Sequence, residues 1–312
     1  MKYKILGVIA FVLILFSACE NELEKQLEFE VSVAPAANVQ ITDSVVTAPK
    51  GTTLQFDFAG EPDFISFSFN RFNLTKSVLT FNTQAAWVTH IQNTLKVFLA
   101  ETSDTLLLNN AKQDSTKIAT RQWTDISALC NLPITANTTN KATVSLNDYR
   151  GKKVCLAFKY STEFAADWQP TWTISNLQVN DTVINTSTKT ATTLAGAMGF
   201  SPFDMLNTTT PYTSADLAGV WNITNTAAMV IKRSTSGSAL NTDWLISKPL
   251  GITKGVNTLS EIVPVKNMTN KVSSYSYLFS VSGEYIVTFA ASNHNYLYEE
   301  NTDRKIKIII TE

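Results

Sequence analysis

The chain has 312 residues, of which 44% are hydrophobic and 16% are charged. This composition supports packed cores and excludes a protein that is disordered throughout. The formal net charge of -1 excludes a general nucleic-acid binder, because such proteins concentrate basic residues on one surface.

Residues 1–18 predict an export signal. Lys2 and Lys4 provide positive charge, and an unbroken apolar stretch follows over residues 5–16. That stretch suits a signal peptide and is shorter than the roughly 18 apolar residues that a membrane-spanning helix needs. It leads into Phe-Ser-Ala-Cys, ending at Cys19, which resembles a bacterial lipobox. We therefore expect cleavage before Cys19 and lipidation of its thiol, with an ordinary secretory signal as the alternative.

Residues 19–27 predict a lipidated tether that is rich in acidic side chains. Three acyl chains would bury several tens of methylene groups at about 0.8 kcal/mol each, which makes the anchor effectively permanent. An acidic run is a typical solvated linker. It also resembles the signal that sends lipoproteins of the Bacteroidota to the outer face of the outer membrane. We expect a protein that faces the cell exterior, with a periplasmic orientation as the alternative.

Both ends of the mature chain predict β-strands, because apolar and polar residues alternate there. The alternating segments are 29–33, 54–58, 65–69, 275–279, 285–291 and 306–310. Three strands alone would leave one apolar face exposed to water. We therefore predict that residues 28–70 and 253–312 pack together as one discontinuous β-sandwich.

Residues 71–252 are then an inserted domain, which is also rich in predicted strands. Apolar residues alternate over 154–160, and short apolar runs begin at Trp172 and Trp244. Amphipathic helical patterns are scarce, and residues 182–212 have the Thr-, Ala- and Gly-rich composition of a long connection. We predict two antiparallel sheets in a jelly roll, so that the whole chain is all-β.

Cys130 and Cys155 are the two cysteines that follow Cys19. In an oxidising compartment a disulfide between them would stabilise the fold by about 3–4 kcal/mol. Spacing in the sequence does not show whether two cysteines are close in space. Two separate buried thiols therefore remain the alternative.

The sequence has no motif that is typical of a catalytic or zinc site. Its two histidines, His90 and His294, are too far apart for a zinc-binding helix. A nucleophile elbow and a phosphate-binding loop are also lacking. Paired carboxylates could hydrolyse glycosides, yet no pattern singles out a pair among Asp167, Asp204 and Asp243. We expect a protein that is not an enzyme.

The segment 163–172 is the best candidate for binding a ligand. It joins two predicted strands and holds Trp168 and Trp172, with Asp167 and Gln169 beside the first of them. An exposed indole offers a flat platform for the C–H face of a sugar ring, and amide and carboxylate groups bind its hydroxyls. Trp172 is also a candidate core residue, because it begins a strand.

The remaining tryptophans are weaker candidates for a binding platform. Trp123, Trp221 and Trp244 have strand-like apolar neighbours and are predicted to lie in the core. Trp87 follows two alanines, and its surroundings do not favour either role.

Several segments resemble domains of Bacteroidota surface proteins. Residues 123–126, 149–160 and 243–249 resemble the jelly roll of cleaved-adhesin or choice-of-anchor domains. In those families the counterpart of 243–249 usually comes first, so the sheet here is expected to be rearranged. Residues 60–67 and 283–293 resemble a PKD- or immunoglobulin-like module. The whole is similar to lipoproteins that are defined by a domain of unknown function and often accompany Sus-type glycan-uptake systems.

This resemblance implies a function as well as a fold. It implies structural calcium held by Asp243, Asn241 and Asp125, a polysaccharide or oligosaccharide ligand, and an outer-membrane transporter as partner. We therefore predict a non-catalytic cell-surface protein that binds glycan. The alternative is a structural or adhesive protein that binds other proteins, which a broad apolar patch or an open sheet edge would favour.

Overall fold

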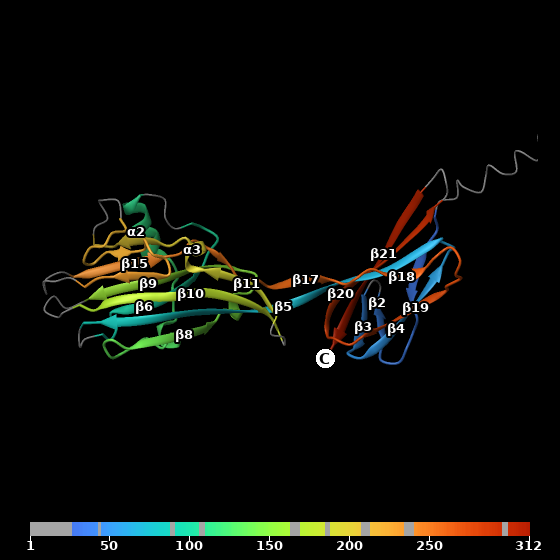
Figure 1. Cartoon of the computed structure of the whole chain (residues 1–312), viewed down its shortest axis with the longest axis horizontal. Coiled ribbons are helices and arrows are strands. Elements are labelled where there is room, and N and C mark those ends of the chain that lie inside the picture. Colours follow the sequence, from blue (N-terminus) through green and yellow to red (C-terminus); the bar gives the residue numbers. More distant parts are fainter. Residues whose placement is uncertain are drawn as a thin grey trace, which may run out of the picture. The chain divides into compact units, whose positions relative to one another are not determined.

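The computed structural model describes residues 27–42, 45–87, 91–105, 110–162, 169–184, 188–206, 213–233, 240–294 and 299–312. The predicted signal peptide and Cys19 lie outside these residues. The chain is mostly β, with 59% strand and 8% helix. It divides into unit 1, which combines residues up to Asn73 with Asn257–Glu312, and unit 2, which is Leu74–Val256 (Figure 1). The boundaries predicted from the sequence are 70/71 and 252/253.

Unit 1 contains two β-sheets. The smaller has the strand order β1-β4-β19, with β1 at Glu30–Val33, β4 at Thr52–Ala59 and β19 at Ser274–Phe279. The larger has the order β18-β5-β20-β21-β3-β2, and β21 and β3 are its parallel pair. Its strands are β18 (Val263–Lys266), β5 (Phe64–Ala86), β20 (Gly283–His294), β21 (Glu299–Thr311), β3 (Val45–Pro49) and β2 (Gln40–Thr42), and β17 (Gly255–Leu259) also pairs with β5.

The core of unit 1 lies between these sheets and is rich in aromatic side chains. Phe56 of the smaller sheet packs against Phe289 of the larger, with ring centroids 5.0 Å apart. Along β20 the buried residues are Tyr285, Val287, Phe289 and Ala291, so the residues between them face the other side of the sheet. The alternation that predicts these strands therefore separates a core face from an outer face.

Unit 2 also contains two sheets. The first sheet consists of β8, the second half of β5, β10, β14 and β13, with β11 paired to β10. The second has the order β12-β15-β9-β6-β7, with β16 paired to β9. The additional strands are β8 (Thr139–Ser145), β10 (Thr171–Val183), β14 (Ala228–Ile231), β13 (Trp221–Asn222), β11 (Lys189–Leu194), β12 (Ser201–Asp204), β15 (Asn241–Ile246), β9 (Lys153–Thr162), β6 (Leu95–Glu101), β7 (Thr124–Asp125) and β16 (Leu250–Gly251).

A single buried cluster joins the inner faces of the two sheets in unit 2. Phe81 and Trp172 come from the first sheet, and Leu156 and Phe158 come from the second. The rings of Phe81 and Phe158 meet edge to face at 5.3 Å. Burial of each such side chain contributes about 1.5–3 kcal/mol, so this cluster holds the sheets together.

The predicted β class is confirmed for most of the chain, and helix α2 (Ala111–Thr120) is an exception to it. Its Ile118 is buried with Trp244, Phe203 and Cys155 on the outer face of the second sheet. The helix begins at Asn110, whose side-chain oxygen accepts a hydrogen bond of 3.1 Å from the Gln113 N–H. Only two of its ten residues, Asp114 and Ile118, are buried, so the sequence shows only a weak helical pattern.

The long connection predicted over residues 182–212 is also wrong in its described part. That part contains β11, helix α3 (Ala195–Met198) and β12. Ala195, Met198 and Phe203 are buried, which anchors the segment to the fold. Short 3₁₀ turns occur at Ser127–Leu129 and Asn147–Tyr149. Among the helices of the described residues, none has both the length and the apolar character to cross a membrane.

Candidate functional site

Several strands of unit 2 begin or end together, at what we call the loop end. In the first sheet β5 ends opposite Thr171, where β10 begins. In the second sheet β9 ends at Thr162, opposite the start of β15. The two sheets are joined here by a 3.0 Å hydrogen bond from the Trp172 indole N–H to the Thr94 hydroxyl. Loops at the end of a sheet sandwich, carried by a rigid scaffold, are a common place for a binding site.

Among the described residues of the loop end, Trp87 is the most exposed aromatic residue. Along β5 the buried residues Phe81, Thr83 and Ala85 alternate toward the core, and the same alternation would bury Trp87. Its backbone instead has a φ of 81°, and 72% of the residue is exposed. A bulky residue at positive φ is an outlier in folded proteins, and backbone strain of this kind is concentrated at functional sites.

Arg233 lies beside Trp87, and Asn137 lies in a loop that is bonded to the end of β5. The guanidinium carbon of Arg233 is 5.6 Å from the centre of the Trp87 ring, which is within cation–π range. Asn137 is exposed, and its backbone N–H donates a 2.7 Å hydrogen bond to the Ala85 carbonyl, which holds its loop against the end of β5. The indole therefore has a cation beside it, and the loop of Asn137 is held two residues away, at Ala85.

The predicted binding segment 163–172 is only partly described. Trp168 and Asp167 lie outside the described residues. Gln169 is 4% exposed, and its amide nitrogen donates a 3.0 Å hydrogen bond to the Thr162 hydroxyl. Trp172 is 1% exposed in the core. The prediction that Gln169 and Trp172 contact ligand is therefore corrected, because both side chains are committed to the interior of unit 2.

A buried carboxyl group lies under the loop end. Asp243 is 4% exposed and faces Asp204 across the pair of β15 with β12. Burial, and then the charge of Asp204, raises the pKa of Asp243 to about 8. One oxygen of this carboxyl group, Oδ2, has no hydrogen-bond partner among the described residues. The opposite residue on β9 is Tyr160, whose pKa is raised by burial and by the charge of Asp243.

The structure does not assemble the predicted calcium ligands. Asp243 and Asn241 are both on β15 and are both buried. Asp125 is exposed on β7, and the strands β9 and β6 lie between β7 and β15. Over the described residues, no three side chains from His, Cys, Asp and Glu are grouped so that they could hold a metal ion.

Cys130 and Cys155 are free, buried thiols. Cys130 belongs to the core between the sheets, and Cys155 belongs to the cluster on the outer face of the second sheet. The predicted disulfide is therefore absent, because opposite faces of one sheet separate the two residues. Burial, together with the charge of Asp125, raises the pKa of the Cys130 thiol to about 12.

Sequence reasoning did not find Trp87, which carries the candidate site. The alternation of β5 gives no signal for the positive φ that exposes it. Of the other tryptophans, Trp221 and Trp244 are buried as predicted, and Trp123 packs partly buried beside Trp244 at 5.2 Å.

Comparison with known proteins gives one family. Residues 18–199 match the model of the family described as a domain of unknown function, DUF5017. The match covers more than half of the chain. No curated protein and no solved structure matches the chain.

Proposed function

We infer that this chain, which belongs to the DUF5017 family, binds glycan at the loop end of unit 2 and does not act as an enzyme. The observation that carries the proposal is the exposed indole of Trp87, held at positive φ. An aromatic side chain that is exposed to water and holds its backbone at positive φ lowers the stability of the fold. A binding role explains why an aromatic residue stands there.

The chemistry around Trp87 suits a sugar ring. The indole presents a flat apolar face, and the ring of a hexose has C–H groups that pack on such a face. Arg233 supplies hydrogen-bond donors beside the ring, and the proposal gives Asn137, whose loop is bonded to Ala85, the role of a further donor and acceptor. Binding sites for small ligands combine aromatic surface with a few polar groups in the same way.

The proposal includes a place for the protein in the cell. We propose that Cys19 is lipidated after removal of residues 1–18, and that the acidic tether directs the protein to the outer face of the outer membrane. In finer detail, unit 1 would be a PKD- or immunoglobulin-like spacer and unit 2 a jelly roll. The bound polysaccharide or oligosaccharide would pass to a Sus-type outer-membrane transporter, which is the proposed partner.

The proposal is tested with purified full-length protein in a detergent that has no sugar headgroup, on an array of polysaccharides. We expect binding to one polysaccharide class, and at least tenfold weaker binding by the Trp87→Gly variant. Glycine readily adopts positive φ, so this variant should melt no lower than the wild type. Trp87→Phe should bind with intermediate affinity.

A matched control is the exposed Leu194, which pairs with Gln178 toward the other end of β10. Leu194→Ala should bind like the wild type, and Trp168→Ala tests the platform that the sequence predicts at residues 163–172. The proposal is overturned if the wild type binds no glycan, or if Trp87→Gly binds as tightly as the wild type.

Asp204 and Asp243 are a pair of carboxyl groups of the kind that glycosidases use. A raised pKa would suit Asp243 to donate a proton. Its residue is only 4% exposed, however, so its carboxyl group is covered in this conformation. We therefore propose binding without hydrolysis, and the array experiment includes an assay for newly released reducing ends.

A second candidate function, adhesion to another protein, is favoured by one observation in unit 1. Leu259, Ile262 and Met268 are each at least 64% exposed, within ten residues of the sequence. Exposed apolar residues that gather on one surface mark protein contacts. Binding of intact cells by the wild-type protein, lost in an Ile262→Ser and Met268→Ser double variant but kept in Trp87→Gly, would favour adhesion.

A further inference from the structure

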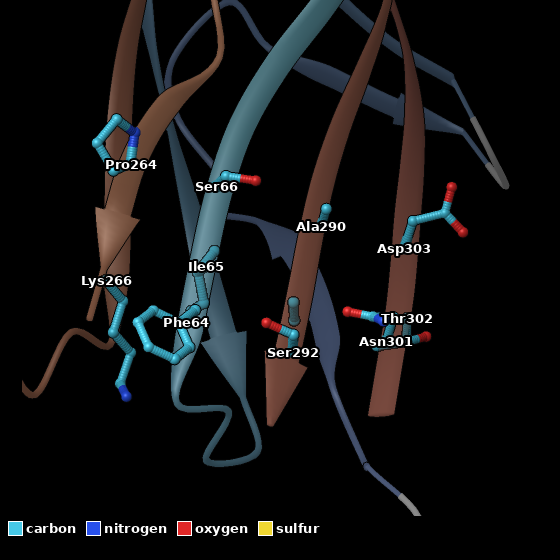
Figure 2. Close-up of a pocket in the computed structure, with 11 residues that line it drawn as sticks. Phe64, Ile65, Ser66, Pro264, Lys266, Ala290, Ser292, Asn301, Thr302 and Asp303 are labelled. Atoms are coloured by element: carbon cyan, nitrogen blue, oxygen red, sulfur yellow. The ribbon is translucent and has the colours of Figure 1, made fainter. Parts of the chain in front are cut away.

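Unit 1 has a groove on the outer face of its larger sheet, with a volume of about 520 Å³ (Figure 2). Volumes of this size are typical of sites for small molecules. The groove crosses four neighbouring strands, β18, β5, β20 and β21. Those strands come from segments that are far apart in the sequence, so local sequence patterns do not indicate the groove.

Strand register gives the groove a floor of small side chains. Ala290 of β20 lies opposite Ser66 of β5 and opposite Asp303 of β21. Ser292, two residues further on, lies opposite Phe64 on one side. Because every second residue of a strand faces the same side, these positions share the outer face. A flat ligand can therefore approach the sheet closely between larger side chains.

An aromatic ring forms one wall of the groove. Figure 2 shows Phe64 between Lys266 and Ser292. The ring of His294 packs edge-on against Phe64, with centroids 5.4 Å apart, and a nitrogen of His294 lies 3.0 Å from the Ser292 hydroxyl. These contacts limit the movement of Phe64, so its ring is a prepared surface for the apolar face of a ligand.

The groove is lined by one cation, Lys266, and one anion, Asp303, and each is bonded to other groups of the protein. The Lys266 ammonium group donates hydrogen bonds to the carbonyls of Asp63, at 3.3 Å, and Pro62. The Asp303 carboxylate pairs with Lys305 at 2.8 Å, and this pair lowers the pKa of Asp303. One cation and one anion leave no net charge to attract an ionic ligand.

We propose that this groove is a second glycan site, which takes an uncharged sugar unit. Phe64 packs against the C–H face of the sugar ring, and Ser66, Ser292 and the Asn301 amide bind its hydroxyl groups. The Asp303 carboxylate accepts from hydroxyls at the other side. The proposal goes beyond binding at Trp87, because it gives unit 1 a binding role in place of a spacer alone.

The experiment uses purified full-length protein in the same detergent, with neutral oligosaccharides of glucose, mannose and galactose and with oligogalacturonate as a charged probe. Binding is measured by calorimetric titration in the Trp87→Gly variant, in which the site of unit 2 is removed. We expect that this variant keeps binding to a neutral oligosaccharide and does not bind oligogalacturonate.

Ala290→Trp, added to the Trp87→Gly variant, fills the floor of the groove. It should weaken the binding of the neutral oligosaccharide at least tenfold. Ile286→Trp is its matched control, because Ile286 lies four residues earlier on the outer face of β20 and is 40% exposed but does not line the groove. Ile286→Trp, added to Trp87→Gly, should bind the oligosaccharide with an affinity within twofold of that of Trp87→Gly. Phe64→Ala, which removes the wall without adding bulk, should weaken binding as Ala290→Trp does.

The outcomes separate the two proposals. If Trp87→Gly abolishes all glycan binding, the groove proposal is overturned and the Trp87 site stands. If Ala290→Trp alone abolishes binding while Trp87→Gly retains it, the groove is the site and the Trp87 proposal is overturned. Binding of oligogalacturonate in preference to neutral sugars overturns the groove's proposed ligand class, and a wild type that binds no sugar overturns both proposals.

Discussion

The carboxyl group of Asp243 is buried on the inner face of β15, opposite Asp204, and in the described part of the chain one of its oxygens has no hydrogen-bond partner. Water no longer solvates its negative charge there, and a second carboxylate adds repulsion. Both effects favour the protonated form. Its pKa therefore rises from 3.8 to about 8. As a result, Asp243 takes up a proton when the chain folds at a pH between these two values.

This shift predicts how stability depends on pH. Because the folded-state pKa is the higher one, the contribution of Asp243 to the free energy of unfolding is fully present below about pH 4 and is lost as the pH rises to about 8. Asp243→Asn removes the charge, although its amide is also left partly unpartnered. We expect the variant to be more stable than the wild type by about 2 kcal/mol at pH 8, with little or no gain at pH 4.

Urea denaturation at the two pH values measures this difference. The exposed carboxyl of Asp104 in the same unit is the control, and Asp104→Asn should not alter the pH dependence. Equal effects of Asp243→Asn at pH 4 and pH 8 would show that folding does not raise the pKa of Asp243.

At the scale of single residues, the sequence predicts the core better than the site. Trp172 and Trp221 are buried because they continue an apolar strand pattern, which is a local property. Trp87 continues such a pattern too, yet its positive φ exposes it. Gln169 belongs to a segment whose composition suits a binding loop. Its side chain is nevertheless buried in unit 2, where its amide nitrogen donates a hydrogen bond to the Thr162 hydroxyl. Neither outcome is encoded in residue type and spacing alone.

At the scale of elements, helix α2 depends on its ends more than on its sequence pattern. Asn110 accepts a hydrogen bond from the Gln113 N–H, one of the four N–H groups that a helix start leaves unpaired. Asn110→Ala should lower the free energy of unfolding by about 1 kcal/mol. Asn110→Asp should be close to neutral, because aspartate is an equally good cap and its charge suits the helix start.

Urea denaturation followed by tryptophan fluorescence tests this prediction, because Trp123 and Trp244 belong to the cluster under the helix. An unchanged midpoint for Asn110→Ala would show that packing of Ile118 alone holds the helix in place.

Elements differ in how well the sequence predicts them. Strands with one buried face, such as β20, show a period of two and are predicted correctly. Helix α2 and the small elements between residues 188 and 204 bury only a few side chains each, so their patterns are weak. The groove of unit 1 could not be predicted, because its floor depends on the register between β5, β20 and β21.

At the scale of the whole molecule, each unit has a hydrophobic core of its own. One cluster contains Phe56, Phe67 and Phe289 in unit 1, and another contains Phe81, Leu156 and Trp172 in unit 2. Unit 1 is built from both ends of the described chain. The pairing of its two parts brings together residues such as Phe67 and Phe289, whose ring centroids are 5.3 Å apart.

Two separate cores predict two unfolding transitions in scanning calorimetry. Phe289 and Leu156 are each almost fully buried, in unit 1 and unit 2 respectively. Replacement of either by alanine should cost about 2–5 kcal/mol and lower the melting temperature of its own unit by about 5–15 °C. The other transition should stay within about 2 °C, because distant sites act independently. A single transition that both variants lower equally would mean that the two cores unfold as one cooperative unit.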